Sequence, residues 1–211
     1  MNATLLIVAK APVLGLAKTR IAATVGPEAA ADLAAAALLD TLDVATTCGA
    51  NVVVAMTGDL GSAARSDEIS NALVDMTVID QRGVGLAERL ANAHADAADH
   101  GPVVQIGMDT PQVTADDLSA ADALVQSDGA VLGPAADGGW WLLGLDDATR
   151  AAFLADIPMS APDTGARTSA ALGAGQARLR ELRDMDTWPD VVAIAAEVPD
   201  RRIAESARRW A

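Results

Sequence analysis

The sequence predicts an α/β fold with a mixed, mostly parallel sheet and helices on both of its faces. Short apolar runs alternate with helical segments over the first 130 residues, as in strand–helix–strand units. These runs are continuously apolar, which is typical of strands buried on both faces. A later pair of runs, at residues 130–132 and 140–145, is joined by a tight loop and breaks the alternation. We therefore expect a mixed sheet.

The first elements follow from apolar runs and capping residues. Residues 4–9 (TLLIVA) and 51–56 (NVVVAM) are expected to form buried strands. A helix should span residues 27–47 between them, because Gly26-Pro27-Glu28 places proline at the first helical position and an acid in the first turn. Residues 59–75 are polar and poorly periodic, and predict at most a short helix.

The middle of the chain repeats the same unit. Residues 77–80 (TVID) predict a brief third strand, and a glycine loop then leads into a helix over 86–99. Residues 102–108 (PVVQIGM) predict the fourth strand. Thr114, with Asp117 three residues later, forms a variant of the capping box and should start the next helix.

The last third is expected to close the domain. Residues 178–183 alternate apolar and charged side chains and predict an edge strand. Helices are expected on either side of it, at residues 149–156, 164–174, 190–196 and 200–210.

Length, composition and charge exclude several classes of protein. A chain of 211 residues with 51% apolar composition suits one domain, residues 1–211. The formal net charge of −14 argues against binding to nucleic acid or to anionic membranes. No apolar run approaches membrane-spanning length, and the start lacks the basic region of a signal peptide. We expect a cytoplasmic protein.

Cysteine and histidine give no sign of a soft-metal site. The single cysteine, Cys48, excludes an intrachain disulfide and is expected to be buried. His94 and His100 have no partner cysteine or histidine nearby, and we expect both at the surface.

A basic segment follows the first strand. Residues 1–27 contain Lys10, Lys18 and Arg20 and no acid. In an acidic protein this segment favours phosphate binding over a merely solvated loop, because open α/β sheets bind ligands at the ends of their strands.

Two common nucleotide motifs are excluded. A P-loop needs lysine directly after its second glycine, but Gly15 is followed by Leu16 and Lys18-Thr19 comes too late. Glu88 stands where the dinucleotide fingerprint needs a third glycine after Gly83 and Gly85.

Asp109 is the strongest single candidate for chemistry. It directly follows the fourth strand, where a carboxylate faces the ligand crevice of an open sheet. A metal or polar-ligand role is favoured over a turn or cap residue before Pro111.

Two further segments could supply polar groups. The loop at 133–139 (GPAADGG) presents Asp137 at its tip, with Trp140 and Trp141 on opposite faces of the strand that follows. Its glycines allow close approach of a ligand or make a plain turn. Asp184 and Asp186 lie on one side of an extended chain, with helix capping by Thr187 as the alternative.

Together these segments resemble a known family. Residues 9–20 resemble its motif A-K-A-P-x-x-G-x-x-K-T-R, and residues 107–111 resemble G-S-D-S-P. Residues 133–145 resemble G-P-A-x-D-G-G-Y-Y-L-I-G-L, and residues 184–190 resemble D-V-D-T-P-E-D. The family is a bacterial group of GT-A-fold glycosyltransferases that includes those linked to arsenosugar biosynthesis. Met108 and Thr110 replace serines, and Trp140 and Trp141 replace tyrosines.

The resemblance implies a fold, a metal and a site. The implied fold is the three-layer, Rossmann-like GT-A fold of nucleotide-diphospho-sugar transferases, shared with molybdenum-cofactor and 2-phospho-L-lactate nucleotidyltransferases. The implied ligands of Mg²⁺ or Mn²⁺ are Asp109 and Asp186, with Asp184 orienting Asp186. The expected nucleotide-binding residues are Lys10, Ala11, Pro12, Gly15, Lys18, Arg20, Gly83 and Asp109.

The expected reaction is transfer from a nucleotide-diphosphate sugar to a small-molecule acceptor. Asp137 and Lys18 are the candidate catalytic residues, and donor or acceptor contacts are expected from Asp137, Gly138, Gly139 and Trp140. The alternatives are a nucleotidyltransferase of guanylyl or cytidylyl type, which takes a nucleoside triphosphate and releases pyrophosphate, and a non-catalytic nucleotide-binding protein. A homodimer is left open.

Overall fold

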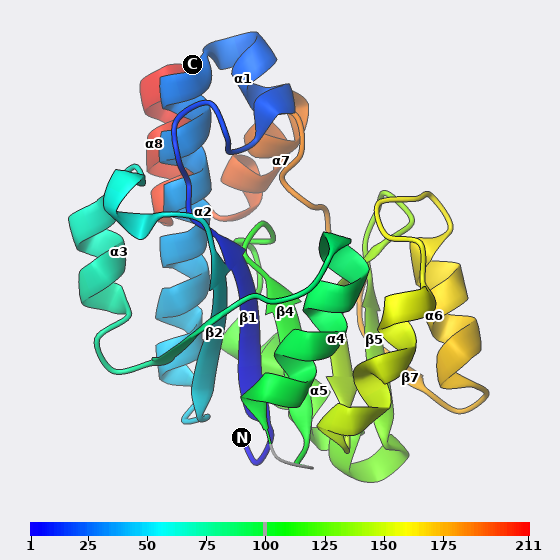
Figure 1. The fold of residues 1–211 in the computed structure, drawn as a ribbon. Coiled ribbons are helices and arrows are strands. Elements are labelled where there is room, and N and C mark those ends of the chain that lie inside the picture. The colour runs from blue at the N-terminus through cyan, green and yellow to red at the C-terminus, as the bar shows by residue number, and fades with distance from the viewer. Residues whose placement is uncertain (99–100) are drawn as a thin grey trace.

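A seven-stranded sheet forms the centre of the computed structural model, which describes residues 1–98 and 101–211 (Figure 1). The strand order is β3-β2-β1-β4-β6-β5-β7. The strands are Thr4–Lys10 (β1), Val52–Thr57 (β2), Thr77–Asp80 (β3), Val103–Gly107 (β4), Ala130–Pro134 (β5), Trp140–Leu145 (β6) and Ala177–Arg178 (β7). Only β6 runs antiparallel to its neighbours. The predicted mixed, mostly parallel sheet is confirmed.

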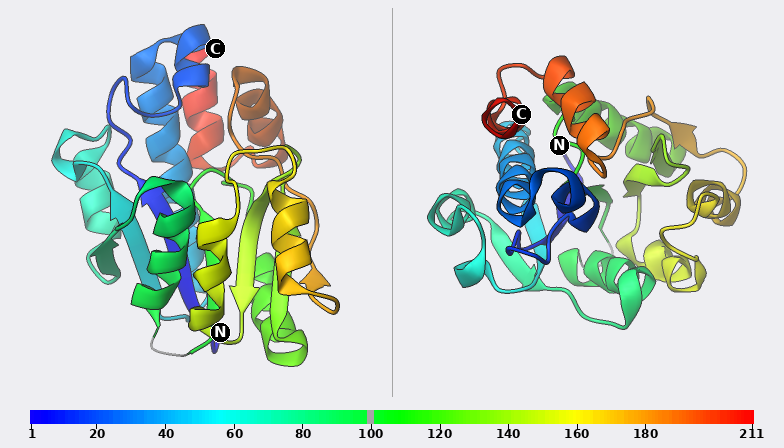
Figure 2. Two further views of the ribbon diagram at one scale, coloured as in Figure 1. Left: turned by 45° about the vertical axis from the view of Figure 1, so that its right-hand side comes forward. Right: turned by 90° about the horizontal axis from the view of Figure 1, so that it is seen from above.

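Helices cover both faces of this sheet. They are Thr19–Val25 (α1), Pro27–Thr47 (α2), Ser66–Ala72 (α3), Gly85–Ala97 (α4), Ala115–Asp128 (α5), Thr164–Leu172 (α6), Trp188–Glu197 (α7) and Arg202–Trp210 (α8), with 3₁₀ helices at Leu60–Ser62 (η1) and Ala148–Asp156 (η2). Helices α2 and α5 pack on one face, while α4 and η2 pack on the other (Figure 2). This gives the three layers expected of the fold.

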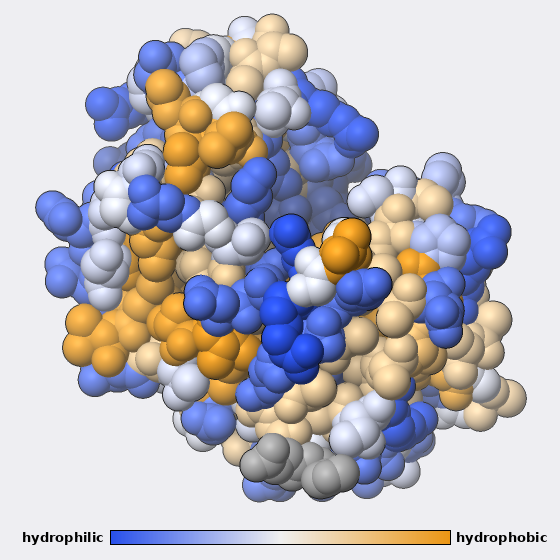
Figure 3. Space-filling view, in the orientation of Figure 1, coloured by the Kyte–Doolittle hydropathy of each residue, from blue (hydrophilic) through white to orange (hydrophobic). Residues whose placement is uncertain are grey.

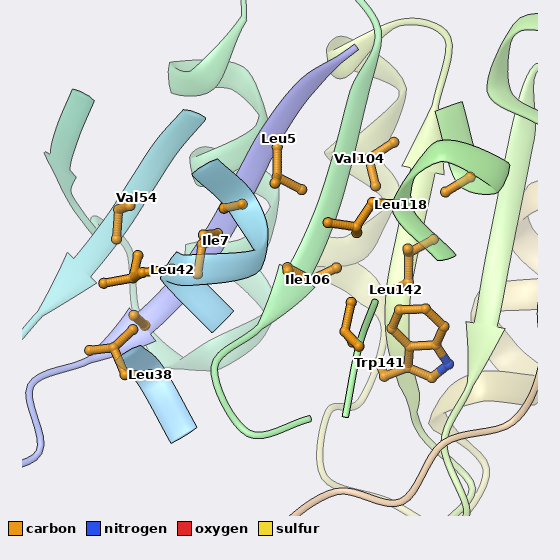
Figure 4. Packing of buried hydrophobic residues seen from close by; sticks show 14 of the residues in the cluster. Leu5, Ile7, Leu38, Leu42, Val54, Val104, Ile106, Leu118, Trp141 and Leu142 are labelled. Carbon is orange, nitrogen blue, oxygen red and sulfur yellow. The ribbon is translucent and has the colours of Figure 1, made fainter. Parts of the chain in front are cut away.

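The largest part of the core lies between the sheet, α2 and α5. Leu38 and Leu42 of α2 and Leu118 of α5 pack against Ile7, Ile106 and other strand residues (Figure 4). Helix α2 is rich in alanine and buried nearly all round, because α1 and α8 cover the side that faces away from the sheet. Small side chains let these layers approach closely, which is why alanine dominates this helix.

Three elements differ from expectation. Residues 149–156 form a 3₁₀ helix that starts at Ala148, and its N-cap is the side chain of Asp147, which accepts a hydrogen bond from Thr149 N. The expected edge strand at 178–183 is reduced to Ala177–Arg178 plus an isolated bridge from Leu182 to Ala135. Residues 10–20 were expected to form one loop, but Thr19 already begins the short helix α1.

The expectation that His94 lies at the surface is wrong. His94 is fully buried on α4, where its Nε2 lies 3.0 Å from the side-chain oxygen of Gln105. Leu90, Ala93 and Ala97 face the sheet from the same helix, and His94 falls within this stripe at helical spacing. His100 lies outside the described residues, and Cys48 is half-buried at the end of α2.

In residues 1–98 and 101–211, no helix combines the length and the apolar character needed to cross a membrane.

Asp40 of α2 caps α8, and its removal should destabilise the fold. Its buried carboxylate accepts hydrogen bonds from the backbone N–H groups of Arg202 (3.0 Å) and Ile203 (2.9 Å). Asp40→Ala leaves both donors without an acceptor, so the free energy of unfolding should fall by about 2 kcal/mol. Urea denaturation checks this. Asp43→Ala removes only an exposed partner of Arg202 and should change the value by less than about 0.5 kcal/mol.

Candidate functional site

A cavity of about 690 Å³ opens at the edge of the sheet where β1 and β4 end. Because β6 runs in the opposite direction, its first residue lies at the same edge. Figure 3 shows a mainly hydrophilic hollow between α1 and the start of α4. The charged side chains that line the cavity are Lys10, Lys18, Arg20, Arg89, Asp109, Asp137, Asp184 and Asp186.

The basic loop after β1 reaches into the cavity through Lys18. Ala11 N donates to Thr57 O (2.8 Å) at the end of β2, and Val13 forms a bridge with Ala63 just after η1. These contacts hold the start of the loop in place. Lys18 then adopts a left-handed backbone conformation (φ 44°) just before α1. This turn brings its Nζ to 2.8 Å from Asp109 Oδ2 and 3.6 Å from Asp186 Oδ1.

The two aspartates expected to bind metal lie around this one ammonium group. Asp109 follows β4, and its backbone oxygen accepts a hydrogen bond from Met185 N (2.8 Å). That bond brings the segment of Asp184 and Asp186 to the end of β4. A side chain at Gly107 would lie 2.8 Å from Asp109 Oδ1, so glycine leaves room for the carboxylate.

Arg20 completes the ion-pair cluster at the rim. Its Nη1 lies 2.7 Å from Asp186 Oδ2, and its side chain is 74% exposed, whereas that of Lys18 is 14% exposed. Lys18 is therefore the inner cation of the cluster, and Arg20 is free to turn towards a ligand at the mouth.

The cluster controls the ionisation of its members. Burial opposes the charged forms of Lys18 and Asp109, but their mutual attraction outweighs it, so the pKa of Lys18 is raised and that of Asp109 is lowered. Asp184 forms no ion pair within the described residues, and the attraction of Lys18 is too weak to offset its burial. Burial raises the pKa of its carboxyl to about 8, and the negative charges of Asp109 and Asp137 add to the rise. The inner cavity thus holds more negative charge than Lys18 alone balances.

The glycine loop supplies a further wall of the cavity. Asp137 lines it, and its Oδ1 accepts a hydrogen bond from Gly139 N (2.8 Å). Trp140 lines the cavity, packs with the apolar cluster of η2 and donates through Nε1 to Thr168 Oγ1 (3.1 Å). Trp141 is buried in the main core on the other face of the sheet, although it also borders the cavity. The expectation that the two rings face opposite sides of the strand is confirmed.

Some expected contact residues do not line the cavity. They are Ala11, Pro12, Gly15, Gly83 and Gly138. Gly83 has φ 120° at the turn into α4, where a side chain would clash with Glu88. Gly138 has φ 90° and packs against the backbone oxygen of Pro162, so its glycine serves the packing of the loop. Gly139 lines the cavity, as expected.

Other cavity residues escaped the sequence analysis. Arg89 of α4 lines the cavity beside the phosphate-binding candidates, and Gln105 of β4 lines its floor. Gln81 donates to the backbone oxygens of Ala9 and Ala55, and so joins the ends of β1 and β2. A signal for Gln105 was present, because it is a polar residue in an otherwise apolar strand.

The residues fit a divalent cation that is shared with a ligand. In the described part of the chain, no group of three or more His, Cys, Asp or Glu side chains is placed to hold a metal ion. Asp109 and Asp186 place carboxylate oxygens around the ammonium group of Lys18, so a cation bound between them would have to share or displace that group. Mg²⁺ is commonly held by one or two carboxylates together with water and substrate phosphates, and Mn²⁺ prefers similar ligands.

A family model and solved structures match this chain. The model described as "Uncharacterized protein conserved in bacteria (DUF2064)" matches residues 39–161. A protein of Desulfovibrio desulfuricans G20, described provisionally as a nucleotide-diphospho-sugar transferase, is 24% identical with a TM-score of 0.87, over 99% of this chain and 94% of that one. No curated protein matches the chain.

Two more distant structures share the fold. Rv0371c of Mycobacterium tuberculosis H37Rv, in complex with manganese, is 19% identical with a TM-score of 0.57, over 93% of this chain and 100% of that one. A CMP:2-keto-3-deoxy-manno-octonic acid synthetase in complex with CTP is 14% identical with a TM-score of 0.56, over 93% and 98%. These likenesses show a nucleotide-sugar transferase or nucleotidyltransferase fold.

Asp184 should make the stability of the ligand-free protein depend on pH. Its carboxyl keeps a proton in the folded state up to about pH 8, whereas the unfolded chain releases it near the usual value of 3.8. The free energy of unfolding therefore falls as pH rises through this window. Asp184→Asn should reduce this fall and be more stable than the parent at pH 8 by at least about 1 kcal/mol.

Urea denaturation from pH 5 to 8 without divalent cations measures this. The exposed Asp156→Asn is the control and should retain the parent slope. An unchanged slope in Asp184→Asn would show that Asp184 ionises normally in the folded protein.

Proposed function

This chain belongs to DUF2064, a family of uncharacterized proteins conserved in bacteria, and we propose that its function is metal-dependent glycosyl transfer from a nucleotide-diphosphate sugar to a small-molecule acceptor. The observation that carries the proposal is the cluster of Asp109, Asp186 and Lys18 in one cavity at the end of the parallel strands. Ligands of open α/β sheets bind at this edge.

The proposed metal ligands are Asp109 and Asp186, with Asp184 orienting Asp186. Mg²⁺ or Mn²⁺ bound there with a diphosphate would neutralise the charge that develops on the leaving nucleotide. Burial of Asp184 beside other carboxylates supports a cation at this point, since it would relieve their repulsion.

Lys18 and Arg20 are the proposed phosphate ligands. Lys18 is enclosed and lies against the inner carboxylates, so it is placed for the phosphate next to the cation. Arg20 is exposed at the rim and presents a planar group that binds two phosphate oxygens at once. Lys10 and Arg89 add positive charge to the same cavity.

Asp137 is the proposed acceptor residue. It lies in the loop between β5 and β6, across the cavity from the basic loop, with Trp140 beside it. A carboxylate there can accept a hydrogen bond from an acceptor hydroxyl and take up its proton as the new bond forms. The indole of Trp140 offers an apolar surface for a sugar ring or an acceptor.

Nucleotidyl transfer is the second candidate, and one observation favours it. Several solved structures of this fold are nucleotidyltransferases, including the synthetase that binds CTP. In that reaction Lys18 would stabilise the departing pyrophosphate. Incubation of the protein with Mn²⁺ and either nucleotide sugars or nucleoside triphosphates distinguishes glycosyl transfer, nucleotidyl transfer and simple nucleotide binding. Release of a nucleoside diphosphate supports glycosyl transfer, and release of pyrophosphate supports nucleotidyl transfer. Binding without turnover indicates a nucleotide-binding protein.

Asp109→Asn tests the metal site directly. A nucleotide sugar with Mn²⁺ should raise the melting temperature of the parent protein, because binding stabilises the native state by about 2.7 kcal/mol at a hundredfold excess over Kd. Asparagine keeps the shape but loses the charge, so the Mn²⁺-dependent part of the shift should disappear. A thermal-shift panel of UDP-, GDP-, CDP- and ADP-sugars measures it.

Asp116→Asn is the matched control, since Asp116 is exposed on α5 and does not line the cavity. It should keep the full shift. If Asp109→Asn keeps it as well, Asp109 does not hold the metal.

A further inference from the structure

One polar side chain lies among apolar residues on the floor of the cavity. Gln105 belongs to β4, and its neighbours Val104 and Ile106 point to the other face, into the main core. Gln105 is only 3% exposed, yet it lines the cavity. A buried carboxamide is unfavourable unless its groups are hydrogen-bonded, so its presence in a core strand calls for a partner.

His94 supplies a partner for one end of this carboxamide. Its Nε2 lies 3.0 Å from Gln105 Oε1, while its Nδ1 has no partner among the described residues. Burial lowers the pKa of His94 to about 4, so the ring is neutral and only one nitrogen carries a hydrogen.

The hydrogen belongs on Nε2 of His94. A hydrogen on Nδ1 would be a buried N–H without an acceptor, which is rare in folded proteins. On Nε2 it is donated to the oxygen of Gln105, and only a lone pair is left unpaired on Nδ1. This assignment fixes the carboxamide, because its oxygen faces His94 and its NH₂ group must face elsewhere.

The NH₂ group of Gln105 opens to the cavity. Fully enclosed side-chain atoms without a partner occur, in the described part of the chain, only at His94, Thr110 and Gln112. The side-chain nitrogen of Gln105 has no hydrogen-bond partner among the described residues, yet it is not one of these enclosed atoms. It must therefore be partly accessible. It is a donor presented to whatever fills the cavity.

The surroundings of this donor favour an uncharged oxygen. Val8 and Leu90 line the same cavity and pack together in one apolar cluster, and no charged side chain among the described residues forms a hydrogen bond with Gln105. Gln105 lies four residues before Asp109, which places it at most about 14 Å away along the chain. A ligand anchored by its diphosphate near Asp109 would reach Gln105 with a sugar or a nucleoside.

We propose that Gln105 is a specificity residue of the transferase: its amide group donates a hydrogen bond to a hydroxyl or carbonyl oxygen of the bound nucleotide sugar, and His94 is the positioning residue that holds the amide in place. This inference rests on the proposed function. It adds a determinant of substrate choice on the floor of the cavity, away from the acidic cluster.

Gln105→Met tests the donor. Methionine keeps the length of the side chain but has no N–H group. The probes are UDP, GDP, CDP and ADP and their glucose or mannose conjugates with Mn²⁺, titrated by calorimetry. The variant should bind the best conjugate roughly 3- to 10-fold more weakly than the parent. The control Gln176→Met, at a half-buried glutamine outside the cavity, should bind it as the parent does.

The paired probes identify the oxygen. Weaker binding of both the free nucleotide and its sugar conjugate assigns the oxygen to the nucleoside, and weaker binding of the conjugate alone assigns it to the sugar. Unchanged binding of both by folded Gln105→Met overturns the proposal.

A double-mutant cycle tests the positioning role of His94. Because His94 acts through Gln105, His94→Leu should weaken binding in the parent but add little in Gln105→Met. A residue that only supports the fold would weaken binding equally in both backgrounds, and that result would reject the positioning role.

A measurement without ligand separates this proposal from the proposed function. Replacing both members of a buried polar pair by apolar groups of similar shape can be nearly neutral or stabilising, and we expect this of a pair that is kept for a ligand and not for the fold. The His94→Leu/Gln105→Met protein should therefore unfold at the same or a higher urea concentration than the parent. A large loss of stability would show that the pair serves folding and would overturn the inference. This result can be obtained even if no probe binds, so it is independent of the proposed function.

Discussion

The hydrogen bond from Met185 N to the backbone oxygen of Asp109 joins two parts of the chain that carry the site. Through it, the segment after β7 is held against the end of β4, and Asp186 reaches the ammonium group that Asp109 already binds. A third part of the chain, the loop after β1, joins the site through the ion pairs of Lys18. Since each part lies at the carboxyl edge of the sheet, the site depends on parallel strands that end together.

The inner end and the mouth of the cavity carry different charges. The enclosed Lys18 faces three carboxylates, of which Asp184 is left without a cation of its own. The more exposed Arg20 stands at the mouth. An anionic ligand therefore meets positive charge first and negative charge behind it, and the two can be reconciled by a divalent cation that enters with the ligand. This order is compatible with the proposed diphosphate ligand even though the protein is strongly acidic.

Sequence patterns revealed the strands and the acidic positions more readily than the fine structure of the cavity. Continuous apolar runs marked β1, β2 and β4, and the resemblance pointed to Asp109 and Asp186. The burial of His94 was missed because its polarity outweighed its place on an apolar helix stripe. Gly83 and Gly138 were expected as ligand contacts, but they do not line the cavity, and their positive φ angles and close packing are a separate reason for glycine there. Such distinctions depend on three-dimensional neighbours that spacing alone does not provide.

The reversed direction of β6 divides the cavity into two parts of different architecture. The half that contains Lys18 and Asp109 is built from crossover connections between parallel strands, whose lengths are constrained by the helices they contain. The opposite wall is a hairpin, whose ends are adjacent in the sheet and whose loop can be lengthened or rebuilt without moving any parallel strand. The wall that carries Asp137 and Trp140 can thus vary among related proteins without any change to the loop and strand ends that hold Lys18 and Asp109.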